Sequence, residues 1–219
     1  QNFADVWDIE IHEEQVFFRT GKDVFKYSKQ NKLELIHSAV SLEYLKKVGN
    51  NLYLQEARKG LLILKNNKFE LFTGKSLFLN QDISGIYELD NRELLVASVK
   101  DGLFRVSSDS TVSRWETNDN NWLQSNSIYC STQIDENTFA FGTSTKGVFI
   151  VDKKGNIIHH INNKSGLQKN NVISVFTDHS KNLWLGLNNG IDYIETSSPF
   201  TSIFPDDDLE GTGYAINIF

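Results

Sequence analysis

Short apolar runs alternate with polar turns along the whole chain, and one arrangement of them recurs. Its clearest copy is an apolar run over 183–187, a polar tip with a glycine at Gly190, and a second apolar run over 191–194. Two apolar runs joined by a short glycine-containing tip are typical of a β-hairpin. The same pattern predicts hairpins over residues 16–27, 52–64, 94–106 and 139–151.

The spacing of these hairpins predicts the fold. The aligned glycines Gly60, Gly102, Gly147 and Gly190 are 42, 45 and 43 residues apart, and Asp23 holds the same position 37 residues before Gly60. Repeats of about 40–45 residues with four strands each are typical of propeller blades. We therefore predict an all-β fold, a partial β-propeller sensor domain over 1–219 that belongs to a larger propeller array. Its five four-stranded blades are expected at about 4–38, 42–80, 82–125, 127–170 and 171–213, with the first strand of another at 214–219.

Several large side chains are expected to fill the core of these blades. A leucine stands a few residues before the first strand of three repeats, at Leu79, Leu123 and Leu167. We interpret these leucines as packing beneath the connecting loops. Trp7, Trp115 and Trp184 lie within predicted strands or beside them and are also expected to pack between sheets.

Composition narrows the class of protein. The 219 residues include 15 Phe, 7 Tyr and 4 Trp, enough to fill a core, and a net charge of −6 argues against a nucleic-acid partner for this domain. Cys130 is the one cysteine, so an internal disulfide is impossible. Apolar runs are all far shorter than the roughly 20 residues of a membrane-spanning helix. The chain starts at Gln1 and contains no Met, so we expect it to be a mature or trimmed piece of a longer protein.

The hairpin tips are the first candidate binding surface. In a four-stranded blade, the tip between the second and third strands lies on the same face as the connection to the next blade. Four of the five tips carry a cation, which would attract an anionic ligand such as an acidic glycan. Trp122, in a long connection, could stack on a sugar ring or anchor its loop. The candidate ligand-binding residues are Arg19, Arg58, Lys59, Lys100, Trp122, Lys146, Asn188 and Asn189. The alternative is that such tips are simply solvated.

Signals of catalysis or metal binding are weak. His159 and His160 are adjacent on a predicted strand, so they point to opposite faces and cannot share a metal. The acidic run at Asp206–Asp208 lacks the alternating ligands of a calcium loop. We therefore predict no catalytic residue, no metal and no cofactor. A carbohydrate-active enzyme stays open as an alternative, because sequence cannot place two carboxylates across a channel.

One stretch resembles a known family. Leu167, Asn170, Val172, Asp178 and Asn182, followed by the run 183–191, resemble the two-component-regulator propeller repeat. This repeat builds the sensor regions of hybrid histidine kinases and triple-tyrosine one-component regulators of Bacteroidetes. The likeness is good over 164–219, fair over 80–151 and poor over 1–75. Val96 and Ala140 stand where Trp184 stands, so the full motif occurs once.

The resemblance implies a periplasmic domain that senses a ligand without catalysis and passes the signal to a downstream, membrane-anchored signalling domain of the parent protein. We expect its ligand to be an oligosaccharide or another small molecule. A structural propeller that binds a protein partner is the main alternative. An open stack of five blades would expose two apolar faces, so we expect the isolated chain to close its ring or to self-associate.

Overall fold

The computed structural model describes residues 5–120 and 127–196, whose regular structure is almost entirely β-strand. Five antiparallel sheets follow one another, and each pairs its strands in sequence order. The first contains β1 (Asp8–His12), β2 (Gln15–Arg19), β3 (Asp23–Tyr27) and β4 (Leu33–His37), and the second β5 (Leu42–Val48), β6 (Asn51–Glu56), β7 (Gly60–Lys65) and β8 (Lys68–Leu71). The third contains β9 (Ile83–Glu88), β10 (Leu94–Ser98), β11 (Gly102–Val106) and β12 (Val112–Arg114). The fourth contains β13 (Ile128–Asp135), β14 (Thr138–Thr143), β15 (Val148–Asp152) and β16 (Ile157–Ile161), and the fifth β17 (Val172–Thr177), β18 (Leu183–Leu187) and β19 (Ile191–Ile194).

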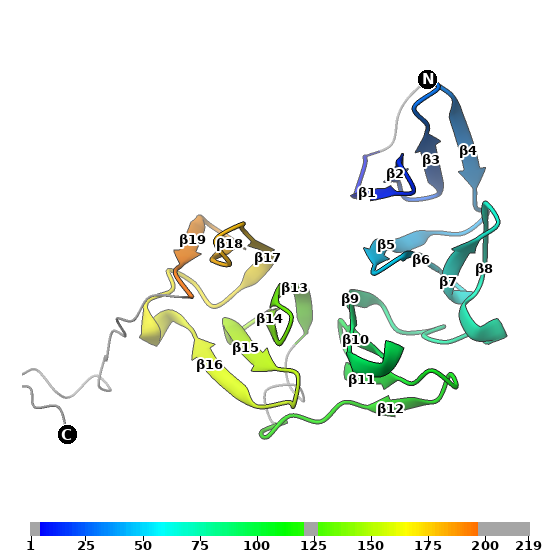
Figure 1. Cartoon of the computed structure of the whole chain (residues 1–219). Helices are drawn as coiled ribbons and strands as arrows, with labels where there is room; N and C mark the ends of the chain where they lie inside the picture. The colour runs from blue at the N-terminus through cyan, green and yellow to red at the C-terminus, as the bar shows by residue number, and fades with distance from the viewer. Residues whose placement is uncertain (1–4, 121–126, 197–219) are drawn as a thin grey trace, which may run out of the picture.

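The sheets stand side by side around an arc, with the first strand of each on the inner side and the last on the outer side (Figure 1). Consecutive first strands contact one another from β1 to β17. This is the arrangement of propeller blades, so the predicted all-β propeller fold is confirmed, and each sheet is called a blade below. Blades 1 and 5 lie apart at the two ends of the arc.

Short 3-10 turns are the one other regular element in the described ranges: η1 (Phe72–Gly74), η2 (Asp90–Arg92) and η3 (Asn163–Ser165). Within those ranges, no helix has the length and apolar character needed to cross a bilayer.

The hydrophobic core lies between the blades rather than inside any one of them. Four clusters of buried side chains each join two consecutive blades. Between blades 3 and 4, for example, Tyr87 and Leu95 pack with Phe139 and Phe149. The middle strands are covered from both sides, so all five residues of β10 are buried, whereas β4 at the outer edge alternates. A strand covered on both faces loses its alternation, as the dense apolar runs indicated.

The repeated glycine has a conformational cause. Gly60, Gly102, Gly147 and Gly190 have φ angles of 90°, 87°, 81° and 110°, in the left-handed region that favours glycine. A Cβ at Gly147 would also lie 2.1 Å from the carbonyl oxygen of Ile161. The glycine pattern therefore marks the point where each hairpin turns back against the neighbouring loop.

Some expectations about core residues were wrong. Leu167 is buried as predicted, but Leu79 is exposed, and Phe78 fills the corresponding place between blades 2 and 3. Phe78 has a left-handed φ of 56°, and its ring packs edge-on against Phe104 of blade 3. Leu123 lies outside the described residues. Of the tryptophans, Trp115 is buried, whereas Trp184 is exposed on the face of blade 5 that points away from blade 4. Trp7, which precedes β1, is exposed as well.

Among the described residues, each end blade has one apolar face that no other blade covers. On blade 1, a paired row runs across all four strands, and Ile9 and Leu35 at its two ends are exposed. The same row in blade 2 is Leu45, Leu54, Leu62 and Leu71, which packs against blade 1. On blade 5, the uncovered face carries Phe176, Trp184, Ile191 and Tyr193, all exposed.

Candidate functional site

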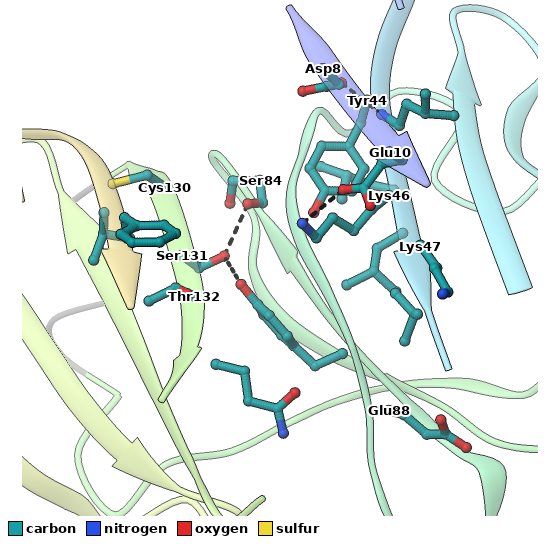
Figure 2. Close-up of a pocket in the computed structure, with 18 of the residues that line it drawn as sticks. Asp8, Glu10, Tyr44, Lys46, Lys47, Ser84, Glu88, Cys130, Ser131 and Thr132 are labelled. Atoms are coloured by element: carbon teal, nitrogen blue, oxygen red, sulfur yellow. Dashed lines mark hydrogen bonds and ion pairs between the residues drawn. The ribbon is translucent and has the colours of Figure 1, made fainter. Parts of the chain in front are cut away.

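A hollow of about 1000 Å³ lies where the first strands of all five blades come together. Its lining comes mainly from β1, β5, β9, β13 and β17 (Figure 2). The first strands carry polar side chains, such as those of Glu10, Lys46 and Gln133, at positions that line this hollow. We call this hollow the channel.

A hydrogen-bonded chain of hydroxyl groups crosses the channel wall between blades 3 and 4. The hydroxyl of Tyr87 bonds to Ser131 Oγ at 2.7 Å, and Ser131 Oγ donates to the carbonyl oxygen of Ser84 at 2.9 Å (Figure 2). A Cβ at Gly85 would lie 2.0 Å from Ser131 Oγ, so Gly85 leaves the room that this contact needs. Burial raises the pKa of Tyr87, which keeps its phenol protonated.

Ion pairs join blades 1 and 2 beside the channel. Lys46 Nζ lies 2.8 Å from Glu10 Oε1 (Figure 2). Asp8 Oδ2 accepts hydrogen bonds from Arg19 Nε at 2.5 Å and from the backbone N–H of Leu45 at 2.9 Å. Arg19 also donates to the carbonyl oxygen of Leu42.

The structure therefore corrects the expectation for Arg19. We predicted a solvent-facing tip cation, but its side chain is buried and holds the two blades together. The physical reason is that Asp8, on the neighbouring strand, offers a carboxylate that compensates the loss of hydration.

The channel also presents polar groups that remain available to a ligand. Lys47, Glu88 and Gln133 line it, and their side chains make no hydrogen bond or ion pair with the described residues. Tyr129 lines it with its side chain exposed. Three lysines face five carboxylates among the lining residues, so the channel has a net charge of −2. The charged residues are Lys46, Lys47, Lys153, Asp8, Glu10, Glu43, Glu88 and Glu136.

The predicted tip residues are distributed over separate places. Arg58 and Lys59 line a groove between blades 1 and 2, where Lys59 Nζ pairs with Glu56 at 2.7 Å. Lys100 lines a different hollow, on blade 3. There the negative charges of Asp101 and Glu116 balance the positive charges of Lys100 and Arg114.

The other predicted tip residues lie farther along the chain. Lys146 is half-buried, and its carbonyl oxygen is bonded to His160 Nε2. Asn188 and Asn189 are exposed at the tip of blade 5. Trp122 lies outside the described residues. Ligand binding by these side chains stays a prediction.

The described residues contain no group of three or more His, Cys, Asp or Glu side chains placed to hold a metal ion. His160 instead stacks on Phe149 at a ring separation of 4.0 Å. Cys130 is half-buried, and burial raises the pKa of its thiol to about 12, so it stays protonated.

Sequence reasoning missed the channel residues, although a signal was present. The first strand of each repeat contains polar residues such as Glu10, Lys46 and Ser131 at positions where the second strand is apolar. Their inward direction could not be deduced, because irregular pairing at residues 128–130 and 172–174 shifts which face a side chain occupies.

Comparisons with known proteins agree with the fold. No family model matches the sequence, and no curated protein matches it. Among solved structures, the chain is similar to the extracellular domain of a one-component system from B. thetaiotaomicron, with a TM-score of 0.70 and 18% identity over 90% of this chain and 28% of that one. It is similar to the extracellular domain of a hybrid two-component system from the same organism, with a TM-score of 0.65 and 19% identity over 89% and 27%.

A third similar structure is virginiamycin B lyase from Staphylococcus aureus, with a TM-score of 0.66 and 10% identity over 90% of this chain and 71% of that one. All three comparisons show the propeller fold, and the first two come from the class of receptor that the repeat motif resembles. The chain spans little more than a quarter of the length of those two receptor domains.

Proposed function

We propose that this chain is part of an extracytoplasmic sensor propeller of a signalling receptor, and that it recognises an oligosaccharide in the channel. The observation that carries the proposal is the meeting of five first strands around one polar hollow of about 1000 Å³. Binding there would touch several blades at once. A ligand could therefore shift the blades as rigid bodies and pass the signal to a downstream, membrane-anchored domain.

The chemistry of the channel suits a neutral sugar. Gln133 supplies an amide, Glu88 a carboxylate and Lys47 an ammonium, so hydroxyl groups would find both donors and acceptors. The exposed ring of Tyr129 offers an apolar surface with a polar edge, which suits the face of a pyranose. The net negative charge of the lining disfavours an acidic glycan at this place.

A panel of oligosaccharides tested by thermal shift would examine the proposal, because a ligand that binds the folded state raises Tm in a saturable way. For any sugar that does so, Tyr129→Ala and Gln133→Ala should each weaken binding by about tenfold. This change in affinity corresponds to the free energy of one or two lost contacts. Ile158→Ala, at an exposed position on β16, is the matched control. A panel without any saturable response would count against the proposal.

A carbohydrate-active enzyme is the second candidate, and one observation favours it. The lyase that shares this fold shows that a propeller of this kind can hold an active site. Chromatography of the same panel after long incubation separates the two functions. A sensor returns every sugar unchanged, whereas an enzyme would release a product.

A further inference from the structure

A groove on the outer side of blades 1 and 2 is chemically unlike the channel. It has a volume of about 480 Å³, within the usual range of small-molecule sites. Its walls come from the end of β4, the connection 38–41, and strands β6 and β8. Both neighbouring blades are present in the structure, so the groove does not depend on the open ends of the arc.

The walls of the groove are largely apolar. Ile36 and Val40 come from blade 1 and its connection, and Leu42, Leu54 and Phe69 come from blade 2. Leu42 and Leu54 are buried in the core cluster that joins the two blades, while Phe69 is only partly buried. Much of the lining is therefore hydrocarbon, part of which is fixed by the core behind it.

The charge of the groove is opposite to that of the channel. Its lining contains Arg58, Lys59 and Lys68 against the single carboxylate of Glu56, a net charge of +2 in a chain whose net charge is −6. Glu56 is buried and already compensated, because its Oε1 accepts from Ser38 Oγ at 2.7 Å and lies 2.7 Å from Lys59 Nζ. Arg58 and Lys68 are exposed, and their side chains make no hydrogen bond or ion pair with the described residues.

We propose that this groove binds an anionic amphiphile, a molecule in which one acid group is joined to an apolar body. The acid group lies at the end of the groove that carries Arg58 and Lys59, where two cations are adjacent. Arg58 provides the donors for the acid oxygens, because Lys59 is engaged by Glu56. The apolar body lies along Leu54 and Phe69. This site is independent of the sugar that we propose for the channel.

Calorimetric titration of the folded chain with simple probes tests the proposal. Hexanoate, octanoate and decanoate should bind with affinity rising on the order of tenfold for each two added methylene groups, as the apolar walls remove hydrocarbon from water. Glucuronate has the acid without the apolar body, and octyl glucoside has the apolar body without the acid. Both should bind at least tenfold more weakly than octanoate.

Three variants locate the site. Arg58→Asn keeps a residue that tolerates the left-handed φ of 66° at this tip and should weaken octanoate about tenfold. Lys169→Asn, at an exposed position outside the groove, is the control and should change nothing. Ala39 is exposed and lines the groove, so Ala39→Asp should weaken octanoate and Ala39→Lys should strengthen it.

Three results would overturn the proposal. They are failure of all three carboxylates to bind, glucuronate binding as tightly as octanoate, and an affinity that ignores the sign of the charge at position 39. Binding of a probe in the channel would not obscure these results. The same titrations with the Tyr129→Ala variant, which lacks the channel contact but keeps the groove, measure binding to the groove alone.

Discussion

Arg19 shows how one side chain can hold two blades together. It donates to the carboxylate of Asp8 and to the carbonyl oxygen of Leu42, while Asp8 also accepts from the backbone of Leu45. These contacts connect the innermost strand of blade 1 with the first strand of blade 2. Because the guanidinium is buried, its charge is tolerated only as long as these partners stay in place.

Removing this side chain should destabilise the fold. Arg19→Ala leaves the Asp8 carboxylate, which is only partly exposed, with a single backbone donor. We predict a loss of about 2–3 kcal/mol in the free energy of unfolding. Urea unfolding followed by fluorescence measures it, with the exposed Arg58→Ala as the control, for which a change within about 0.5 kcal/mol is expected. Equal values for the two variants would contradict the bracing role.

Glu34 makes a second prediction at the residue scale, this time about pH. Hydrogen bonds from Lys32 and Lys26 and their positive charges lower its pKa from 4.5 to about 2. A carboxyl whose pKa is lower in the folded state contributes stability above the unfolded pKa, and this contribution disappears as pH falls from about 4.5 to about 2.

Wild type should therefore lose more stability than Glu34→Gln between pH 5 and pH 2. Urea midpoints at several pH values in that window measure the difference. Added salt should reduce this difference, because Glu34 and its partner Lys32 lie at the surface, where salt screens their attraction. Parallel curves for the two proteins would show that Glu34 contributes nothing to the pH dependence.

Blades pack closely where one strand offers a residue without a side chain. Gly142 on β14 is buried, and a Cβ there would lie 2.5 Å from Cys130 Sγ and 2.7 Å from a methyl carbon of Val172 on blade 5. Gly186 on β18 holds the same place in the repeat, because it pairs with Ser174 as Gly142 pairs with Cys130. At Gly186 the nearest atom is the hydroxyl of Ser174, which can rotate away.

This matched pair predicts an unequal effect of one methyl group. Gly142→Ala should cost about 1–3 kcal/mol of folding stability, because blades 4 and 5 must separate slightly to admit it. Gly186→Ala should be close to neutral, since no described blade covers that face. Thermal or urea unfolding of the two variants measures the contrast. A similar cost at both positions would mean that another surface covers blade 5 in solution.

The architecture of the whole molecule was largely predictable from the sequence, because each glycine of the repeat marks a backbone conformation that other residues disfavour. The hairpins at Gly60, Gly102, Gly147 and Gly190 followed from that local requirement. The channel was not predictable, because it forms only when strands about 45 residues apart meet, as Tyr87 meets Ser131. The burial of Arg19 was not predictable either, because it depends on the ion pair with Asp8 on the neighbouring strand.

The two end faces of the arc, which no described blade covers, correspond to the two kinds of face that meet between consecutive blades. The row through Ile9 and Leu35 on blade 1 corresponds to the row by which blade 2 packs on blade 1. The face of blade 5 that carries Phe176 and Trp184 corresponds to the face of blade 4 that receives blade 5. The first end of one copy could therefore pack on the last end of another, which is a heterologous contact.

We predict that the isolated chain self-associates through this contact, with a mean mass that rises with concentration in sedimentation equilibrium. Phe176→Ser with Ile191→Ser on blade 5, or Ile9→Ser with Ile11→Ser on blade 1, should each abolish association, because every contact needs one face of each kind. Both pairs are exposed, so stability should change little. Mixing the two double variants should restore one dimer, since each retains the face that the other lacks. A monomeric wild type would refute self-association, and association that survives in one of the variants would show instead that like faces pair with like.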